Sequence, residues 1–342
     1  MPLPSAPRIL VIRRDNIGDL VCTTPLLAAL RQRYPEGWIG VLANSYNAPV
    51  LAGNPHIDAV YTYTKAKHRA PSETLLGVMW RRFTLLLQLR RMHLDDIILA
   101  APAAQPRLLA LARWLKPKRI IAFGLTGSGA NDVALPLATD DAHEVDTVFR
   151  IARLYGIDGP PPACCVAAPK GATLRDSNTI AVHVSARKPS QRWAAERFVT
   201  LMQNLHASQP ALRFVLLWAP GRTDDPLHPG DDEKAAAIIA ALGPDFPVQP
   251  TPTAGLDQLI AALAPCDAMI CADGGAMHVA AGLGLPIVCL FGNSGLQRWR
   301  PWGVPQQVLQ KPSLDVADIS VEEVAAAFNA LRDTSYENHI NE

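Results

Sequence analysis

Short, almost continuous apolar runs alternate along the N-terminal half of the chain with longer segments whose apolar residues recur at helical spacing. The runs that predict buried strands are 8–13, 38–44, 59–63, 95–100 and 119–124. The segments that predict helices are 23–35, 75–92 and 107–115. Alternation of this kind is typical of a mostly parallel sheet with helices on both faces.

The same alternation restarts after residues 159–178, a stretch rich in Pro, Gly and small residues that predicts a domain linker. The second set of predicted strands is 179–185, 213–219, 268–272 and 286–292. The second set of predicted helices is 194–208, 233–243, 255–266, 276–284 and 320–334. Ser320 and Glu323 have the spacing of a capping box at the start of the last helix. The pattern predicts two doubly wound α/β domains with a cleft between the carboxyl ends of their sheets.

The length and composition agree with two domains in the cytoplasm. A chain of 342 residues is too long for one core to be the natural expectation. It has no uninterrupted apolar run long enough to cross a membrane, and its start lacks the features of an export signal. The six cysteines form no C-x-x-C pair, so a zinc site or a disulfide framework is not expected.

Positive charge is concentrated in the first 120 residues, which hold 17 Lys and Arg against 7 Asp and Glu. One interpretation is that a few solvated helices are basic, and the other is that this half meets an anionic partner. The stretch 65–69 supplies Lys65, Lys67 and Arg69 as candidate acceptor-binding residues. Because no nucleic-acid motif and no interleaved aromatic residues accompany these charges, a phosphorylated or membrane-surface substrate is favoured.

The first candidate motif, RRDNIGDLVCTTP at 13–25, runs from the first strand into a helix. Asp19 is expected at the carboxyl end of that strand, facing the cleft. There it can act as a general base that accepts a proton from an attacking hydroxyl. The alternative is that Asp19 only caps the helix, a position that Asp favours.

The second candidate motif follows the strand at 268–272. Asp273, Gly274 and Gly275 form a turn that opens a helix, whose first N–H groups have no partners within the helix and favour an anion. Asp273 is better suited to sugar hydroxyls than to phosphate. The alternatives are a plain turn for the glycines and a packed or capping role for His278.

A third polar stretch, 183–198, begins with the first strand of the second half. Ser185, Arg187, Lys188 and Arg192 gather at its end, either as ordinary loop polarity or as a site for a leaving diphosphate. The chain contains no D-x-D triplet and no G-x-x-x-x-G-K-[ST] motif, and the Gly-rich 124–130 lacks dinucleotide spacing. A metal-held diphosphate is therefore not expected.

Together these motifs resemble the lipopolysaccharide heptosyltransferases of glycosyltransferase family 9. The resemblance lies in RILVIRRDNIGDLVCTTPLLAALRQRYP near the start, in CADGGAMHVAAGLGLPIVCLFGNSGLQRWRPWG near the end, and in QRWAAERF between them. It implies a GT-B fold of two Rossmann-like domains. It also implies an inverting, metal-independent transferase without a cofactor, which uses a nucleotide sugar that is commonly ADP-heptose.

The resemblance also assigns roles to individual residues and divides the chain. Asp19 corresponds to the catalytic base, and the donor turn comprises Asp273, Gly274, Gly275, Ala276, Met277 and His278. The family lysine before Arg-Trp is Gln191 here, so we expect Lys188 or Arg192 to provide its charge, with Ser185 completing the donor site. The expected divisions are an acceptor domain at 1–165, a donor domain at 166–318, and a helix at 319–342 that returns to the first domain.

The expected partners are a nucleotide sugar and an anionic, lipid-linked glycan at the inner face of the cytoplasmic membrane, with no nucleic acid. Two alternatives from other classes remain open at the level of the sequence. One is a nucleotide-sugar epimerase of the same fold, against which the basic N-terminal half argues. The other is a non-catalytic nucleotide-sugar-binding protein, against which Asp19 argues.

Overall fold

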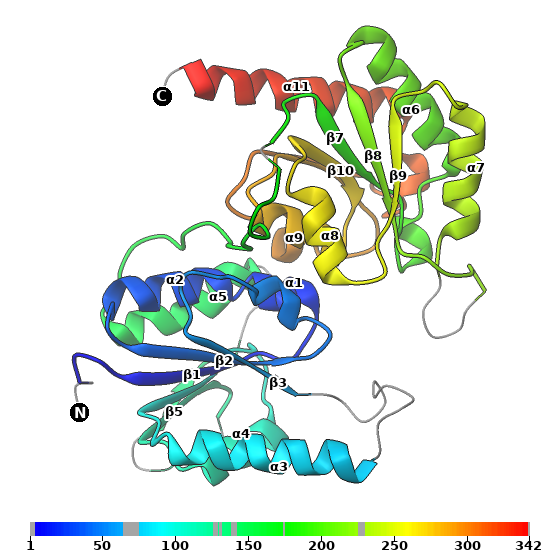
Figure 1. The fold of residues 1–342 in the computed structure, drawn as a ribbon. Helices are drawn as coiled ribbons and strands as arrows, with labels where there is room; N and C mark the ends of the chain where they lie inside the picture. The colour runs from blue at the N-terminus through cyan, green and yellow to red at the C-terminus, as the bar shows by residue number, and fades with distance from the viewer. Residues whose placement is uncertain are drawn as a thin grey trace. The chain divides into compact units, whose positions relative to one another are not determined.

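The computed structural model divides the chain into two compact units, Met1–Ala167 and Ala168–Glu342. The structure describes residues 4–63, 75–125, 129, 132–137, 142–173, 175–224 and 230–340. Within these residues each unit contains one six-stranded parallel sheet with helices on both of its faces (Figure 1).

The first sheet has the strand order β3-β2-β1-β4-β5-β6. The strands are β1 (Arg8–Ile12), β2 (Trp38–Asn44), β3 (Ala59–Tyr63), β4 (Asp96–Leu99), β5 (Arg119–Phe123) and β6 (Val133–Leu135). Strand β1 pairs in parallel with both β2 and β4. The winding direction therefore reverses between β1 and β4, and this reversal is the position where open α/β sheets bind ligands.

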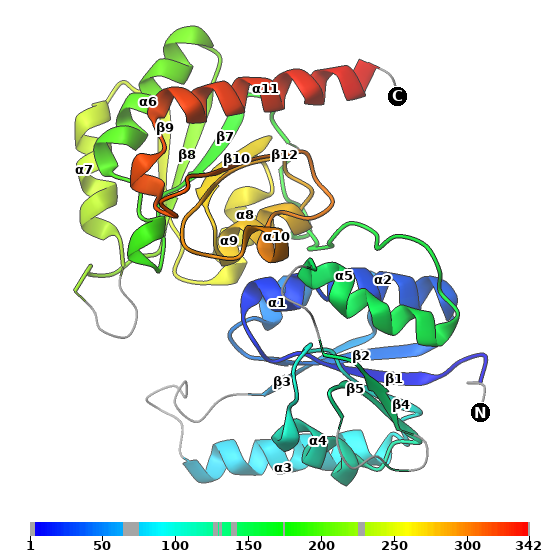
Figure 2. The same ribbon diagram turned by 180° about the vertical axis from the view of Figure 1, so that it is seen from behind.

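Two layers of helices cover the first sheet (Figure 2). One layer consists of α3 (Leu75–Arg91) and α4 (Pro106–Leu115). The other consists of α1 (Ile17–Val21), α2 (Thr24–Arg33) and α5 (Glu144–Phe149), with the 3-10 segments η1 (Ala48–Leu51) and η3 (Arg150–Tyr155). Leu10 and Ile97 of the sheet pack with Leu89 of α3 and Leu108 of α4 in one continuous core. The apolar runs of the sequence thus become strands buried between two helical layers.

The second sheet has the order β12-β11-β10-β7-β8-β9, which is the winding of the first sheet read from the opposite edge. Its strands are β7 (Thr179–His183), β8 (Arg213–Trp218), β9 (Val248–Pro252), β10 (Ala268–Ala272), β11 (Ile287–Phe291) and β12 (Gln306–Gln310). Strand β7 pairs in parallel with β8 and β10. The reversal of winding therefore lies between β7 and β10.

The helices of the second unit also form two layers. One layer consists of α6 (Ala195–Ser208), α7 (Asp232–Leu242) and α11 (Val321–Ile340), and the other contains α8 (Leu256–Leu263) and α9 (Gly275–Gly282). Shorter pieces are α10 (Leu296–Trp299), η4 (Pro189–Gln191) and η5 (Val316–Asp318). Trp193 is fully buried, and its indole N–H donates to the carbonyl of Ile319 at 3.0 Å. This contact ties the loop after β7 to the segment that leads into α11.

The predicted fold class, two doubly wound α/β domains, is confirmed. The capping box at the start of α11 is also present, because the Ser320 backbone N–H donates to Glu323 at 2.9 Å and the Glu323 N–H donates to the Ser320 hydroxyl at 3.2 Å. Helix α11 packs against α6, β11 and β12 of its own unit, and its return to the first unit stays a prediction. None of the helices in the described ranges combines the length and apolarity that a bilayer crossing requires.

Candidate functional site

Asp19 lies in α1, the short helix that follows β1, and its side chain is 8% exposed. One carboxylate oxygen, Oδ2, accepts the backbone N–H of Asn16 and the side-chain amide of Asn16, both at 2.9 Å. Asp19 therefore does cap its helix, from the third helical position. The capping interpretation is realised, and it uses only one of the two oxygens.

The second oxygen of Asp19 belongs to a buried ionic network. Arg13 Nη2 donates to Asp19 Oδ1 and to Glu144 Oε1, both at 2.6 Å, while Arg13 Nη1 donates to the carbonyl of Ala100 at 2.6 Å. Arg13 is 1% exposed and Glu144 is fully buried. Arg13 Nε also lies 3.1 Å from Asp15 Oδ2. Burial by itself lowers the pKa of Arg13, but the surrounding carboxylates outweigh it and raise that pKa above its ordinary value.

This network fixes the carboxylate of Asp19 in a defined orientation at the strand end. A buried charge is tolerated only when it is paired and hydrogen-bonded, and here one guanidinium serves two carboxylates from distant parts of the chain. Arg13 was part of the motif, whereas no feature of the sequence connects Glu144 with Asp19. The only local signal was a Glu in the first turn of α5, a position that acidic residues favour anyway.

A hollow of about 390 Å³ opens beside this network, at the carboxyl ends of β1 and β4. Its lining residues are Arg14, Asp15, Gln105, Pro106, Arg107 and Leu108. It lies at the reversal of winding of the first sheet, and it is lined by two arginines and one aspartate. The predicted acceptor residues Lys65, Lys67 and Arg69 lie outside the described residues.

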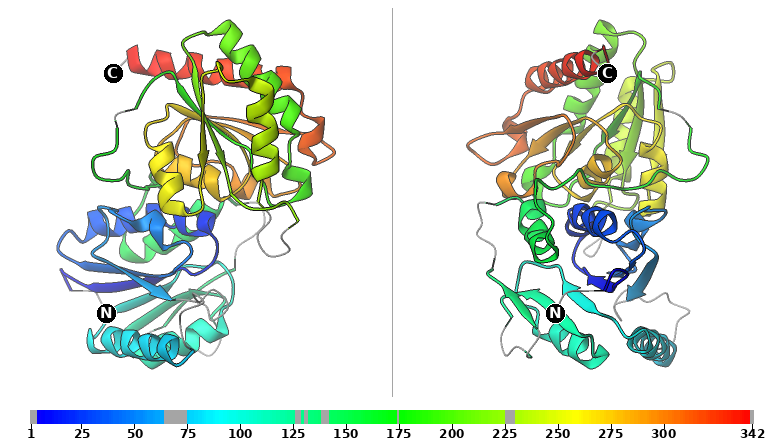
Figure 3. Two further views of the ribbon diagram at one scale, coloured as in Figure 1. Left: turned by 45° about the vertical axis from the view of Figure 1, so that its right-hand side comes forward. Right: turned by 90° about the vertical axis from the view of Figure 1, so that its left-hand side faces the viewer.

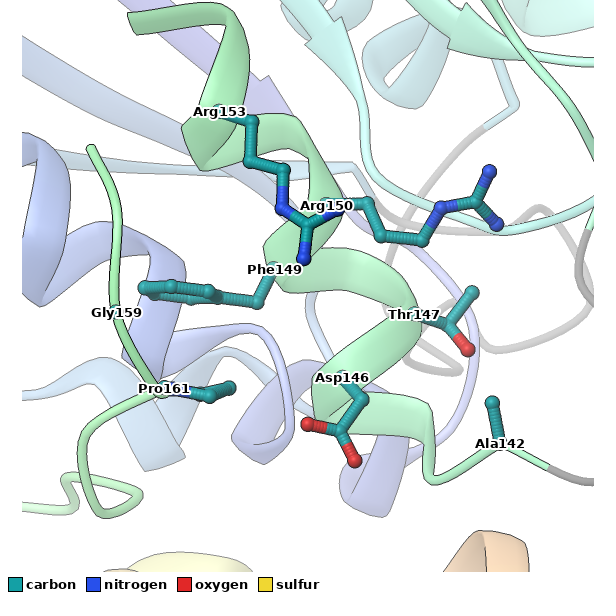
Figure 4. A pocket seen from close by; sticks show the side chains of 8 residues that line it. All are labelled: Ala142, Asp146, Thr147, Phe149, Arg150, Arg153, Gly159 and Pro161. Carbon is teal, nitrogen blue, oxygen red and sulfur yellow. The ribbon is translucent and has the colours of Figure 1, made fainter. Parts of the chain in front are cut away.

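A second hollow in the first unit, of about 260 Å³, lies beside α5 and η3. Figure 4 shows Asp146, Arg150 and Arg153 projecting from successive turns of this helical segment. The guanidinium of Arg150 lies over the ring of Phe123, 5.7 Å from its centroid. Because the charges here are mixed and the hollow contains no residue of the three motifs, we assign it no part in the site.

In the second unit, Asp273 follows β10 directly and Gly274 precedes the first residue of α9. A side chain added at Gly274 would meet no protein atom within 4 Å, so the backbone is open to close approach on that side. Asp273 Oδ2 accepts the side-chain amide of Gln191 at 2.8 Å and the hydroxyl of Ser294 at 2.5 Å. The carboxylate is thus held by two neutral donors.

Gln191 reaches Asp273 because two loops approach each other closely. A Cβ at Gly292 would lie 2.1 Å from the carbonyl oxygen of Ser190, so only glycine allows the turn η4 to pass this near. The side chain of Gln310 donates to the carbonyl of Gly292 at 3.0 Å and steadies the same loop. Gln191, which stands where the family has a lysine, is therefore hydrogen-bonded directly to the carboxylate of Asp273.

The predicted cationic loop lies at the end of β7, next to β10 in the sheet. Lys188 Nζ donates to the carbonyl of Asn293 at 3.0 Å, and Arg192 Nε donates to the carbonyl of Ala186 at 3.1 Å. The hydroxyl of Ser185 accepts the backbone N–H of Ala219 at 2.9 Å. The structure therefore brings this loop and the Asp273 turn together at the winding reversal of the second sheet.

Lys234 is a further cation at this edge, and it was not predicted. Its ammonium donates to the carbonyl of Val184 at 2.9 Å and lies 4.9 Å from the ring centroid of Phe198. Desolvation, aided by the nearby charge of Arg192, lowers the pKa of Lys234 to about 8, although Asp231 opposes the shift. Its sequence surroundings, an acidic helix start, resemble those of any surface lysine.

His278 and Met277 are placed by packing. His278 is 5% exposed, and its ring meets Trp299 edge-on with centroids 6.0 Å apart. Met277 is fully buried with its sulfur 3.1 Å from Cys289 Sγ. The packed interpretation of His278 is thus realised. The donor-binding roles of Ala276, Met277 and His278, and the position of Asp19 across a cleft from Asp273, stay predictions.

Comparison with known proteins agrees with the family that the motifs resemble. The family model of glycosyltransferase family 9 (heptosyltransferase) matches residues 155–323. Lipopolysaccharide heptosyltransferase 3 of Escherichia coli is 24% identical over 302 residues, which cover 83% of each chain. In structure, the E. coli ADP-heptose lipopolysaccharide heptosyltransferase II superimposes with a TM-score of 0.74 at 21% identity, covering 96% of this chain and 99% of that chain. The E. coli heptosyltransferase WaaC, solved with ADP, gives 0.77 at 17% identity, covering 95% and 99%. The GT-B prediction is confirmed.

Proposed function

We propose that this chain, which belongs to glycosyltransferase family 9 and is a glycosyltransferase, uses ADP-heptose as its donor. The proposed reaction transfers heptose to a phosphorylated lipopolysaccharide core or a related glycan. The nucleotide and the sugar are supported by the names of its relatives, which include heptosyltransferases solved with ADP and with a fluorinated ADP-heptose. The acceptor and the metal independence are our inferences from the residues, and the inverting stereochemistry is our inference from the resemblance to the family.

The observation that carries the proposal is the arrangement at the winding reversal of the second sheet. Asp273 offers a carboxylate oxygen to sugar hydroxyls, and beside it the N-terminus of α9 offers N–H groups at an open glycine. Lys188, Arg192 and Lys234 add positive charge at the same edge. A sugar linked to a diphosphate has both of the chemical features that these groups bind.

Asp19 is proposed as the general base of a single displacement. The acceptor hydroxyl oxygen forms the new bond to the anomeric carbon while its proton passes to Asp19. The bond between that carbon and the diphosphate oxygen breaks, and the nucleoside diphosphate leaves with the bonding electrons. Attack from the face opposite to the leaving group inverts the configuration at the anomeric carbon.

The acceptor is proposed to bind the first unit through its anionic groups. Arg14 and Arg107 line the hollow beside the Asp19 network, and the charge of Asp15 in the same hollow is already paired with Arg13. Lys65, Lys67 and Arg69 are proposed to extend this basic surface. A lipid-linked acceptor places the reaction at the inner face of the cytoplasmic membrane, where anionic lipids attract basic surfaces.

Transfer is proposed to need no divalent metal. The chain lacks a D-x-D triplet, and the cations of the second unit are suited to neutralise the leaving diphosphate instead. A chelator should therefore leave transfer unchanged. Activity that is abolished by a chelator and restored by Mg²⁺ or Mn²⁺ would contradict this part of the proposal.

The proposal is tested first by calorimetry with ADP-heptose, ADP-glucose, UDP-glucose and GDP-mannose, and then by transfer to truncated lipopolysaccharide cores. We expect binding of ADP-heptose at the micromolar level or tighter and a product whose new linkage has the configuration opposite to that of the donor. Preferred binding of another nucleotide sugar would replace the proposed donor. A product that retains the donor configuration would exclude the single displacement.

A further inference from the structure

The outer face of α3 exposes large apolar side chains to solvent. Met79 is 63% exposed, Trp80 is 66% exposed and Phe83 is 48% exposed, and the rings of Trp80 and Phe83 lie 6.0 Å apart. Trp114 of the adjoining helix α4 is 39% exposed, and the guanidinium of Arg90 of α3 lies over its ring. We call Met79, Trp80 and Phe83 the α3 face. Neighbouring exposed aromatic residues on a globular domain mark an interaction surface more often than scattered apolar residues do.

Packing of the helix explains why these side chains point outward. Leu89 is fully buried, and Leu85 and Leu86 pack against the same core, so one side of α3 already covers the sheet. Met79, Trp80 and Phe83 project from the remaining surface of the helix. In Figures 1 and 3, α3 (cyan) lies on the far side of the first unit's sheet from α1 and α2. The helix is therefore apolar on the sheet side and aromatic on the solvent side.

The charges carried by helices α3 and α4 have one sign. Helices α3 and α4 carry arginines and contain no Asp or Glu. The exposed cations nearest in sequence to the aromatic residues are Arg81, Arg91, Arg113 and Lys116. Exposed Trp and Phe bordered by cations, without acidic residues, are the combination that binds an anionic membrane interface.

We propose that the α3 face docks on an anionic lipid membrane, with Trp80 and Phe83 entering the headgroup region and the arginines contacting lipid phosphates. A protein partner would have to supply an acidic and apolar surface of matching shape, whereas an anionic bilayer provides both features without specific shape. The proposal of this docking surface depends only on the residues of α3 and α4. Its use in bringing the enzyme to a lipid-linked acceptor rests on the proposed function.

The full-length protein can be tested by co-sedimentation with vesicles. We expect binding to vesicles of phosphatidylglycerol and phosphatidylethanolamine, no binding to phosphatidylcholine, and a marked loss at about 0.5 M salt. The double variant Trp80→Ser/Phe83→Ser should bind at least about ten-fold more weakly, because it removes most of the inserted apolar area. Arg81→Gln and Arg91→Gln should each weaken binding about five-fold.

Two controls make the test specific to this face. Leu137 is 53% exposed elsewhere in the first unit, so Leu137→Ser changes exposed apolar surface outside the α3 face and should bind like the wild type. Trp80→Phe should keep binding, but it should reduce the quenching of tryptophan fluorescence by brominated lipids. Quenching that is unchanged in Trp80→Phe would show that Trp80 does not enter the bilayer.

Three results would overturn the proposal: equal binding to anionic and neutral vesicles, unchanged binding of Trp80→Ser/Phe83→Ser, or a dimer that this double variant abolishes. The last result would assign the surface to a second copy of the chain. Transfer to a deacylated, water-soluble acceptor separates docking from catalysis, because the double variant should match the wild type there. If neither protein transfers a sugar, the proposed function fails while the vesicle result still decides the docking.

Discussion

Replacement of Asp19 by Asn tests the proposed base, and the structure predicts two separate effects. Both oxygens of Asp19 accept hydrogen bonds, Oδ1 from Arg13 at 2.6 Å and Oδ2 twice from Asn16 at 2.9 Å. The amide nitrogen of Asn must face one of these donors. Loss of one charge-assisted hydrogen bond costs about 1.5–3 kcal/mol, and Arg13 keeps its bond to Glu144. We therefore expect a melting temperature lowered by roughly 5–10 °C.

The second effect is on catalysis. An amide cannot accept the acceptor proton, so transfer should fall by about 10²–10⁴-fold, which is about 3–5.5 kcal/mol of barrier. Donor affinity should hardly change, because the base acts on the acceptor. The assay is single-turnover transfer at a temperature well below the melting transition, with calorimetry of the donor in parallel.

Glu144→Gln is the matched control because it also removes one negative charge from the Arg13 guanidinium, at the same distance of 2.6 Å. It should shift the melting temperature similarly, yet leave the carboxylate of Asp19 in place. We expect it to lose less than about ten-fold in transfer. If both variants lose transfer by the same factor, the network and not proton acceptance explains the effect, and the assignment of Asp19 as base is refuted. Near-wild-type transfer by Asp19→Asn would refute it directly.

Four further predictions concern the second unit. Gln191→Glu places a like charge beside Asp273 and should weaken donor affinity at least about ten-fold by calorimetry, while an unchanged affinity would remove Asp273 from the donor site. The double variant Lys188→Ala/Arg192→Ala should lose about 1.5–3 kcal/mol of donor binding per charge, and unchanged kinetics would leave the diphosphate to the α9 N-terminus alone. Because the pKa of Lys234 is about 8, wild-type donor affinity should fall between pH 7 and 9, and Lys234→Met should make affinity weaker and flat across that range. The pKa of Lys234 is lowered from its ordinary value of 10.5 to about 8 in the folded chain, so between these pH values the unfolded chain binds more protons than the folded chain. The free energy of unfolding should therefore rise with pH over this range, and Lys234→Met should remove that rise.

The sequence was sufficient to predict the elements that are recognisable from their own residues. Strands such as β10 and β11 are buried at every position, so their apolar runs are continuous and unmistakable. The edge strands β9 and β12 have the sequences VQPTP and QQVLQ, half-exposed and largely polar, and neither was predicted. The polar residues of β9 and β12 do not identify them as strands without the neighbour that each pairs with, whereas the edge strand β3, AVYTY, is apolar enough to be predicted.

The candidate site shows the same division between local and distant causes. Asp19 and Asp273 stand out because each follows an apolar strand within a few residues. Their partners do not stand out in this way. Glu144 binds the same guanidinium as Asp19 and lies 131 positions from Arg13, and Gln191 donates to Asp273 across 82 positions. The contact of Gln191 with Asp273 is created by the sheet topology, which places the ends of β7 and β10 side by side. The contact of Glu144 with Arg13 is created by the packing of α5 against α2 in the same helical layer.

The departure at Gln191 changes the electrostatics of the donor edge in a definite way. A lysine at this position would form an ion pair with Asp273, whereas Gln191 and Ser294 hold the same oxygen as neutral donors. In the proposed donor site, the two neutral donors place no positive charge beside Asp273, which favours its contact with sugar hydroxyls over a contact with phosphate. In the proposed site, Arg192 and Lys234 would then supply the positive charge for the diphosphate, and they lie close enough for their charges to interact.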